Sequence, residues 1–140
     1  MKRYGLFILA VALLACSCQH EPIDKQEADA IVTKYIKKNF KSNDNTERAV
    51  WYYNGLEEER IELSFWYEED EDIIAENAFV YYIDENWNMG DRFLHPHRII
   101  LVQKTNGKYT VFQRSTMPSV HPWVNDWDFL FFFANGKFWN

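Results

Sequence analysis

The sequence predicts an α+β fold in which one amino-terminal amphipathic helix packs on a curved antiparallel sheet of about five strands. Two observations carry this prediction. Apolar residues recur at helical spacing over residues 24–40, and from residue 49 onward aromatic and β-branched residues are enriched and follow a period of two. Asn-Gly dipeptides separate several of the later segments, as turns between antiparallel strands do.

The helix is predicted to begin after Asp24, because Asp24 followed by Glu27 three residues later has the spacing of a capping box. Its apolar face consists of Ala28, Ile31, Val32, Tyr35, Ile36 and Phe40. The opposite face carries Lys34, Lys37 and Lys38, which fall toward the carboxyl end, where the helix dipole favours cations. The polar residues 41–47 end the helix, which needs a sheet to cover its apolar face.

The first two strands are predicted at residues 49–53 and 60–67, around a turn that begins at Asn54. In the second of them, one face carries Ile61, Leu63, Phe65 and Tyr67, and the other carries Arg60, Glu62, Ser64 and Trp66. An acidic loop follows, and then a strand at about residues 77–83.

A hairpin is predicted from residues 99–104 and 109–114 about Asn106 and Gly107, which both tolerate the positive φ of a type I′ turn. Asn135 and Gly136 indicate a last strand or hairpin at the carboxyl terminus. One helix followed by antiparallel strands is similar to the plan of cystatin-like and NTF2-like domains. This likeness is one of architecture and carries no function with it.

The amino terminus is typical of an export signal. Lys2 and Arg3 precede an apolar run at residues 5–15, whose length lies within the roughly 7–15 residues of a signal-peptide core and below the roughly 20 of a membrane-spanning helix. The stretch Leu13-Leu14-Ala15-Cys16 resembles the lipobox of bacterial lipoproteins. This resemblance covers only residues 1–18.

The resemblance implies that the Cys16 thiol receives a diacylglyceryl group, that the signal is cut before Cys16, and that the new amino terminus is acylated. The expected organisation is a signal peptide at residues 1–15, a polar tether at 16–23 and a single domain at 24–140. Acyl chains then hold the protein to a bacterial membrane, within the cell envelope. Ser17, where Asp would favour the inner membrane, makes the outer membrane the expected address by the same resemblance.

Cys18 is the weaker lipidation candidate, because no large aliphatic residue lies at the required place before it. The alternative is that both cysteines are apolar filler at the end of the signal. A Cys16–Cys18 disulfide is not expected, since it would close a strained loop around one residue and add almost no stability.

Composition argues against several functions. The formal net charge of −6 disfavours contact with phosphate backbones, so we expect no nucleic-acid partner. The chain contains no Gly-x-Ser-x-Gly motif, and its five glycines form no phosphate-binding loop. We therefore expect neither enzyme activity nor a cofactor.

Two segments resemble metal sites in part. Asp84, Asn86 and Asn88 alternate as calcium ligands do, but an EF-hand requires Gly at position six and an acidic residue at position twelve, where this chain has Met89 and His95. An ordinary turn with Asx side chains bonded to nearby backbone is the preferred interpretation.

The other segment is His95-Pro96-His97, with His121 further on. On an extended segment these two histidines, separated by one residue, are expected to point to opposite sides. A proline bend would instead bring both toward one ion, with His121 and a carboxylate completing the set. Because the sequence does not fix that geometry, loop histidines are preferred and no metal ligand is assigned. The acidic runs at residues 57–59 and 68–72 are interpreted as solvated loops rather than a cation surface.

Aromatic content is the remaining signal, with 11 Phe, 8 Tyr and 6 Trp. Neighbouring strand residues point to opposite faces, so rings lie on both sides of the sheet, whereas the helix covers one. We therefore expect a binding or interaction module that uses an aromatic sheet face, with a glycan or an envelope protein as partner. The candidate ligand-binding residues are Trp66, Trp87, Trp123 and Trp127. The alternative is a small NTF2-like enzyme with a His/carboxylate pocket between helix and sheet.

Overall fold

The computed structural model of the protein describes residues 21–55, 60–65, 71–88, 94–118 and 126–140. The described elements are one helix, α1 (Lys25–Asn39), and the strands β1 (Arg48–Tyr53), β2 (Arg60–Leu63), β3 (Ile73–Glu76), β4 (Ala78–Asp84), β5 (Leu94–Gln103), β6 (Tyr109–Thr116), β7 (Trp127–Ala134) and β8 (Lys137–Trp139).

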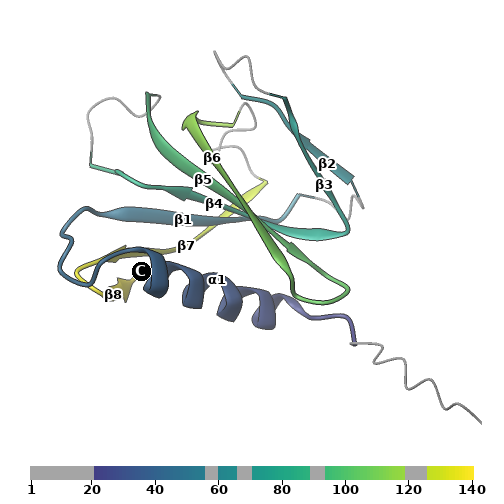
Figure 1. The fold of residues 1–140 in the computed structure, drawn as a ribbon, viewed down its shortest axis with the longest axis horizontal. Coiled ribbons are helices and arrows are strands. Elements are labelled where there is room, and N and C mark those ends of the chain that lie inside the picture. Colours follow the sequence, from purple (N-terminus) through teal and green to yellow (C-terminus); the bar gives the residue numbers. More distant parts are fainter. Residues whose placement is uncertain (1–20, 56–59, 66–70, 89–93, 119–125) are drawn as a thin grey trace, which may run out of the picture.

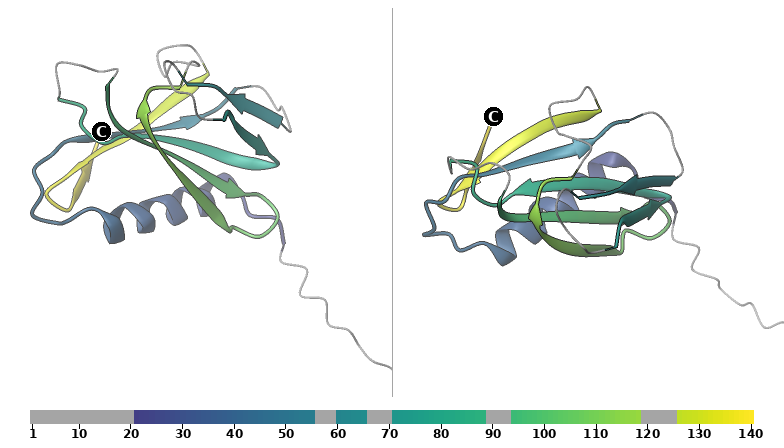
Figure 2. Two further views of the ribbon diagram at one scale, coloured as in Figure 1. Left: turned by 45° about the horizontal axis from the view of Figure 1, so that its top comes forward. Right: turned by 90° about the horizontal axis from the view of Figure 1, so that it is seen from above.

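Six of these strands form one antiparallel sheet in the order β6-β5-β4-β1-β7-β8. Helix α1 lies across one face of this sheet, and the small β2–β3 sheet lies on the other side (Figures 1 and 2). The predicted α+β class with one helix on an antiparallel sheet is confirmed. The estimate of about five strands was too low, since the main sheet alone has six.

The predicted pairing of the first two strands was wrong. β1 lies between β4 and β7, whereas β2 pairs with β3 in the separate sheet. Within β2 the predicted faces are confirmed, because Leu63 is fully buried while Arg60 and Glu62 are exposed. β3 was missed, because its four residues directly follow the acidic run.

Helix α1 begins as predicted. The Asp24 carboxylate accepts a hydrogen bond from the Glu27 N–H at 2.8 Å, and the Asp24 N–H donates to the Glu27 carboxylate at 3.1 Å. The buried residues of its apolar face are Ala28, Val32, Tyr35, Ile36 and Phe40. Just before the helix, the Ile23 N–H donates to the Lys104 carbonyl at 2.8 Å, which attaches the entering chain to the β5–β6 turn.

The sheet separates two hydrophobic cores. The helix-side core joins α1 to residues that include Val50, Tyr81, Ile83, Ile100 and Phe133. The outer core lies between the main sheet and β2–β3, and includes Trp51, Leu63, Ile73, Tyr82, Ile99 and Trp127. Because alternate residues of a strand point to opposite faces, Tyr81 and Tyr82 of β4 contribute to different cores.

The two Asn-Gly turns differ. Asn135 and Gly136 between β7 and β8 both have positive φ, at 50° and 70°, and the predicted carboxyl-terminal hairpin is confirmed. Between β5 and β6 Gly107 has φ 68°, whereas Asn106 is not in the positive-φ region, so the type I′ prediction was wrong. The Gly107 N–H instead donates to the Gln103 carbonyl at 2.9 Å and closes a wider loop.

Within the described part of the chain, no helix has the length and apolar character that crossing a bilayer requires.

Candidate functional site

Five aromatic side chains form a continuous cluster on the outer face of β1, β7 and β8, which we call the aromatic patch: Trp51, Trp87, Phe129, Phe132 and Trp139. The ring centroids of Phe129 and Phe132 lie 4.7 Å apart, and those of Phe132 and Trp139 lie 6.0 Å apart. Trp51 lies beneath, 5.1 Å from Trp87 and 5.8 Å from Phe129. Phe129 and Trp139 are each 40% exposed, so apolar rings of the patch meet solvent.

A β-bulge explains how Phe129 and Phe132 come to share a face although they are three residues apart. In the pairing of β1 with β7, Val50 faces Phe131 while Trp51 faces Phe129, so Leu130 is an extra residue. Leu130 and Phe131 both pack toward the helix-side core, whereas Phe132 packs toward the outer core. Without the bulge, strand alternation would place Phe129 and Phe132 on opposite faces.

Of the four tryptophans predicted to bind a ligand, the structure describes two, and these lie in different surroundings. Trp87 belongs to the aromatic patch and lies 6.1 Å from Phe132. Trp127 is only 6% exposed and packs in the outer core against Tyr53 and Tyr82, at 5.1 and 5.9 Å. Trp66 and Trp123 lie outside the described residues. Sequence reasoning did not find Phe129 or Trp139, because their common face depends on the bulge and on the pairing of β7 with β8.

Hydrogen bonds position Trp87 at the end of β4. The backbone N–H of Trp87 donates to the Glu47 carbonyl at 3.0 Å, and the Asn88 side-chain amide donates to the Glu47 carboxylate at 2.8 Å. Asp84 accepts from the Asn86 N–H at 3.0 Å, so the expected Asx turn is present. The turn after β4 thus holds Trp87 against Trp51 and Phe132.

A second candidate site lies on the same face of the main sheet, but it is buried. Asp84, His95 and His97, which we call the His–Asp cluster, are 1%, 4% and 0% exposed. Nε2 of His95 lies 2.5 Å from Oδ1 of Asp84, and Nδ1 of His97 lies 2.6 Å from the Tyr82 hydroxyl. The two imidazole centroids are 4.2 Å apart.

The expectation that His95 and His97 point apart was wrong. Both lie in β5, and residues two apart in a strand share a face. β4 and β5 pair in a register that places Asp84 opposite His97. Pro96 is tolerated in this interior strand because the β5–β6 register shifts between Leu94 and His97, where the ladder is already interrupted.

Burial shifts the ionisation of His97 and of its neighbour Tyr82. Burial, and then the neighbouring His95, lower the pKa of His97 to about 3, so its imidazole is neutral near pH 7. Burial, and then the charge of Asp84, raise the pKa of Tyr82 well above its usual value, so its hydroxyl remains protonated. The cluster therefore offers a neutral imidazole and a protonated phenol in contact.

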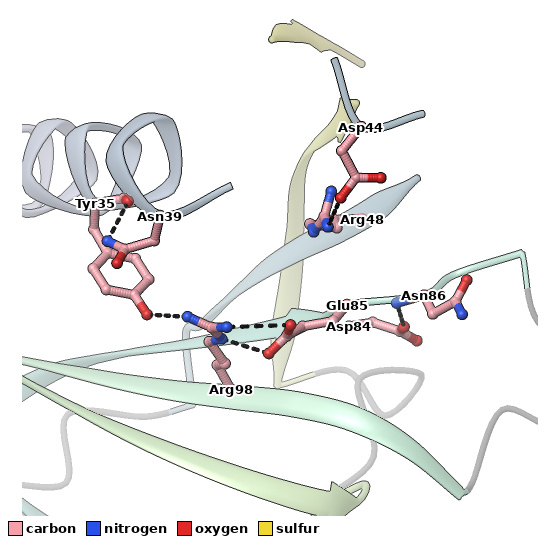
Figure 3. A network of polar contacts seen from close by, with 8 residues as sticks. All are labelled: Tyr35, Asn39, Asp44, Arg48, Asp84, Glu85, Asn86 and Arg98. Atoms are coloured by element: carbon pink, nitrogen blue, oxygen red, sulfur yellow. Dashed lines mark hydrogen bonds and ion pairs between the residues drawn. The ribbon is translucent and has the colours of Figure 1, made fainter. Parts of the chain in front are cut away.

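A third polar group joins the carboxyl end of α1 to the sheet on the helix side (Figure 3). Arg98 forms an ion pair with Glu85 and donates to the Tyr35 hydroxyl, and Arg48 donates to Asp44 at 2.6 Å. The guanidinium carbons of Arg48 and Arg98 lie 4.1 and 4.8 Å from the centre of the Phe40 ring. These contacts hold α1 and the loop that follows it against the sheet. Glu85 takes part in them on the helix side, whereas Asp84 contacts His95 on the other face.

A cavity of about 340 Å³ lies between α1 and the β5–β6 turn, and its lining residues are Ile31, Lys34, Tyr35, Lys38, Gly107 and Tyr109. It contains no histidine and no carboxylate. His95 and His97 lie on the other face of the sheet, away from α1, whereas the NTF2-like enzyme alternative requires a His/carboxylate pocket between helix and sheet. His121 and residues 57–59 and 68–70 lie outside the described residues, while Glu71 and Asp72 are exposed.

Comparison of the chain with protein-family models, with curated proteins and with solved structures finds no match.

Proposed function

We propose that this protein is a lipid-anchored protein of the bacterial cell envelope that binds a partner protein through the aromatic patch, and that it is not a catalyst. The observation that carries the proposal is the 40% exposure of both Phe129 and Trp139 within a cluster of touching rings. Contiguous exposed aromatic rings favour partner binding, because covering them removes apolar surface from water.

The arrangement of the rings favours a protein over a glycan. A sugar ring stacks flat, so a glycan site uses exposed rings that lie in parallel. In the patch, the planes of Trp87 and Phe132 are inclined by 50°, and those of Phe132 and Trp139 by 32°. An uneven apolar surface of this kind fits the side chains of a protein partner better than a pyranose.

The lipid anchor is proposed from the resemblance of the Cys16 segment to a lipobox. The chain enters at the amino end of α1, where Ile23 bonds to Lys104. β8 and the adjoining end of β7 lie near the other end of α1, where Phe133 packs against Phe40 and Lys37 lies over Phe138 (Figure 1). A helix of 15 residues spans about 22 Å, so Ile23, where the described chain enters the domain, and β8 lie near opposite ends of α1.

For the architecture, we propose the cystatin-like or NTF2-like plan, which the single helix across one face of an antiparallel sheet supports. We do not adopt the NTF2-like enzyme as the function. The described cavity beside α1 is lined by lysines, tyrosines, an isoleucine and a glycine, so this lining does not supply the His/carboxylate pair that the enzyme alternative requires.

The test places a photo-crosslinking amino acid at position 139 or 129 of the lipidated chain in its native membrane. Position 74 is the matched control, because Ile74 is 47% exposed on β3 and lies outside the patch. We expect positions 139 and 129 to crosslink to the same protein and position 74 not to do so. Replacing Phe132 by Ser should abolish that crosslink.

Equal crosslinking from all three positions would contradict the proposal. Titration of the purified protein with a panel of envelope glycans tests the other partner class. Saturable quenching of tryptophan fluorescence that is lost in Trp87→Ala would replace the protein partner by a glycan.

A further inference from the structure

We propose that Asp84, His95 and His97 form a binding site for a zinc-type divalent transition-metal ion. The three side chains come from the adjacent strands β4 and β5, and one ligand atom from each lies within 4.8 Å of the others. All three are buried, so an ion there would lie in the interior of the protein. This inference is independent of the proposed partner-binding function.

The chemistry of the three ligands identifies the class of ion. Two imidazoles and one carboxylate suit Zn²⁺ and neighbouring transition metals, whereas Ca²⁺ and Mg²⁺ prefer oxygen ligands alone. Three protein ligands leave a fourth position of a tetrahedral ion open to water or another small ligand.

An unpaired ring nitrogen is the second observation. Nε2 of His97 is buried and has no hydrogen-bond partner among the described residues, although the side chain is 0% exposed. Buried polar atoms are normally paired, so one without a partner calls for an explanation. A metal ion bound at Nε2 supplies the missing partner.

Tyr82 completes the arrangement. A histidine that binds a metal through one nitrogen usually donates a hydrogen bond from the other, which fixes the orientation of the ring. Nδ1 of His97 lies 2.6 Å from the Tyr82 hydroxyl, which is placed to accept that bond. Tyr82 is therefore a positioning residue for His97 and not a ligand.

Binding requires one local change. Nε2 of His95 and Oδ1 of Asp84 lie 2.5 Å apart, as a hydrogen-bonded pair. Two ligands on a tetrahedral ion with bonds of about 2.0–2.1 Å lie about 3.3 Å apart. The ion thus takes the place of the proton between these two atoms, and the two side chains separate slightly.

The first experiment uses the full-length lipidated chain in detergent, loaded with one equivalent of Zn²⁺ and then desalted. We expect one zinc per chain and an X-ray absorption spectrum that contains two imidazole ligands. The midpoint temperature of thermal unfolding should rise by about 5–10 °C in excess Zn²⁺ and return to its metal-free value when a chelator is added. Mg²⁺ should not change it. Loss of the zinc on desalting, or a spectrum without two imidazoles, would overturn the inference.

Variants then locate the site. Asp84→Asn should weaken zinc affinity at least about tenfold, and the exposed carboxylate variant Glu62→Gln should leave it unchanged. His97→Cys loaded with Co²⁺ should add a thiolate-to-cobalt absorption band that the wild type lacks, which a merely structural His97 would not produce. Unchanged affinity in folded Asp84→Asn, or no new band in folded His97→Cys, places any bound metal elsewhere. The wild-type measurements decide the question if a variant does not fold.

Discussion

The Tyr82 hydroxyl lies 2.6 Å from Nδ1 of His97, and both side chains are fully buried between the main sheet and β2–β3. Tyr82→Phe removes the hydroxyl and leaves a buried ring nitrogen without its partner. We expect a loss of about 1–3 kcal/mol in the free energy of unfolding, measured by urea denaturation of the metal-free protein. Tyr109→Phe is the control, because Tyr109 is 45% exposed. Equal effects of the two substitutions would show that the Tyr82 hydrogen bond has no special role.

The capping box at the start of α1 gives a second prediction. Asp24→Ala removes the acceptor for the Glu27 N–H and should lower the free energy of unfolding by about 1 kcal/mol. Circular dichroism during denaturation measures this change. The control is Asp72→Ala, which removes an exposed carboxylate outside any helix and should have little effect.

Asp44 predicts a pH dependence. Hydrogen bonds from Thr46, and then from Arg48, hold the pKa of Asp44 well below its usual value of 3.8. The unfolded chain therefore takes up a proton at a higher pH than the folded protein does. The stability that Asp44 contributes is fully present above about pH 4 to 5, and it is lost as the pH falls through and below the usual carboxyl range.

Asp44→Asn should thus be less stable than the wild type at neutral pH, and the difference should shrink as the pH falls from about 5 to 2. Denaturation midpoints across this range measure the difference. Glu71→Gln, at an exposed position, should follow the wild-type curve. A difference in stability between Asp44→Asn and the wild type that stays constant with pH would show that protonation of Asp44 is not coupled to unfolding.

The lipid anchor is tested at the two cysteines. Cys16→Ser should abolish labelling with a radioactive fatty acid and release the protein from the membrane fraction, because only acyl chains are expected to hold it. Cys18→Ser should retain both the label and the membrane association. Label that persists in Cys16→Ser would move the anchor to Cys18.

The sequence correctly predicted those structural features that depend on residues close together in the chain. Asp24 and Glu27 predicted the capping box, the helical spacing from Ala28 to Phe40 predicted the buried face, and Asn135-Gly136 predicted the last hairpin. Each of these features is decided within a few residues of itself. The partner of a strand is not decided locally, because it can lie far away in the sequence. The sequence analysis therefore paired β2 with β1, whereas β2 pairs with β3 in the structure.

The two candidate sites depend on ladder irregularities that no local pattern shows. The aromatic patch needs the extra residue Leu130, which changes the face on which Phe132 lies. The His–Asp cluster needs β5 to continue through Pro96, where the proline favoured a loop in the sequence analysis. The expectation that His95 and His97 point apart misapplied strand alternation, because residues two apart in an extended chain share a face.

The backbone bond between Ile23 and Lys104 has a mechanical consequence. A pull on the amino terminus reaches the domain through this bond and the first turn of α1, and α1 joins the sheet through side chains rather than through a backbone ladder. If the proposed lipid anchor transmits tension to the amino terminus, the helix would detach from the sheet first, while the six strands of the main sheet would stay joined by their backbone hydrogen bonds.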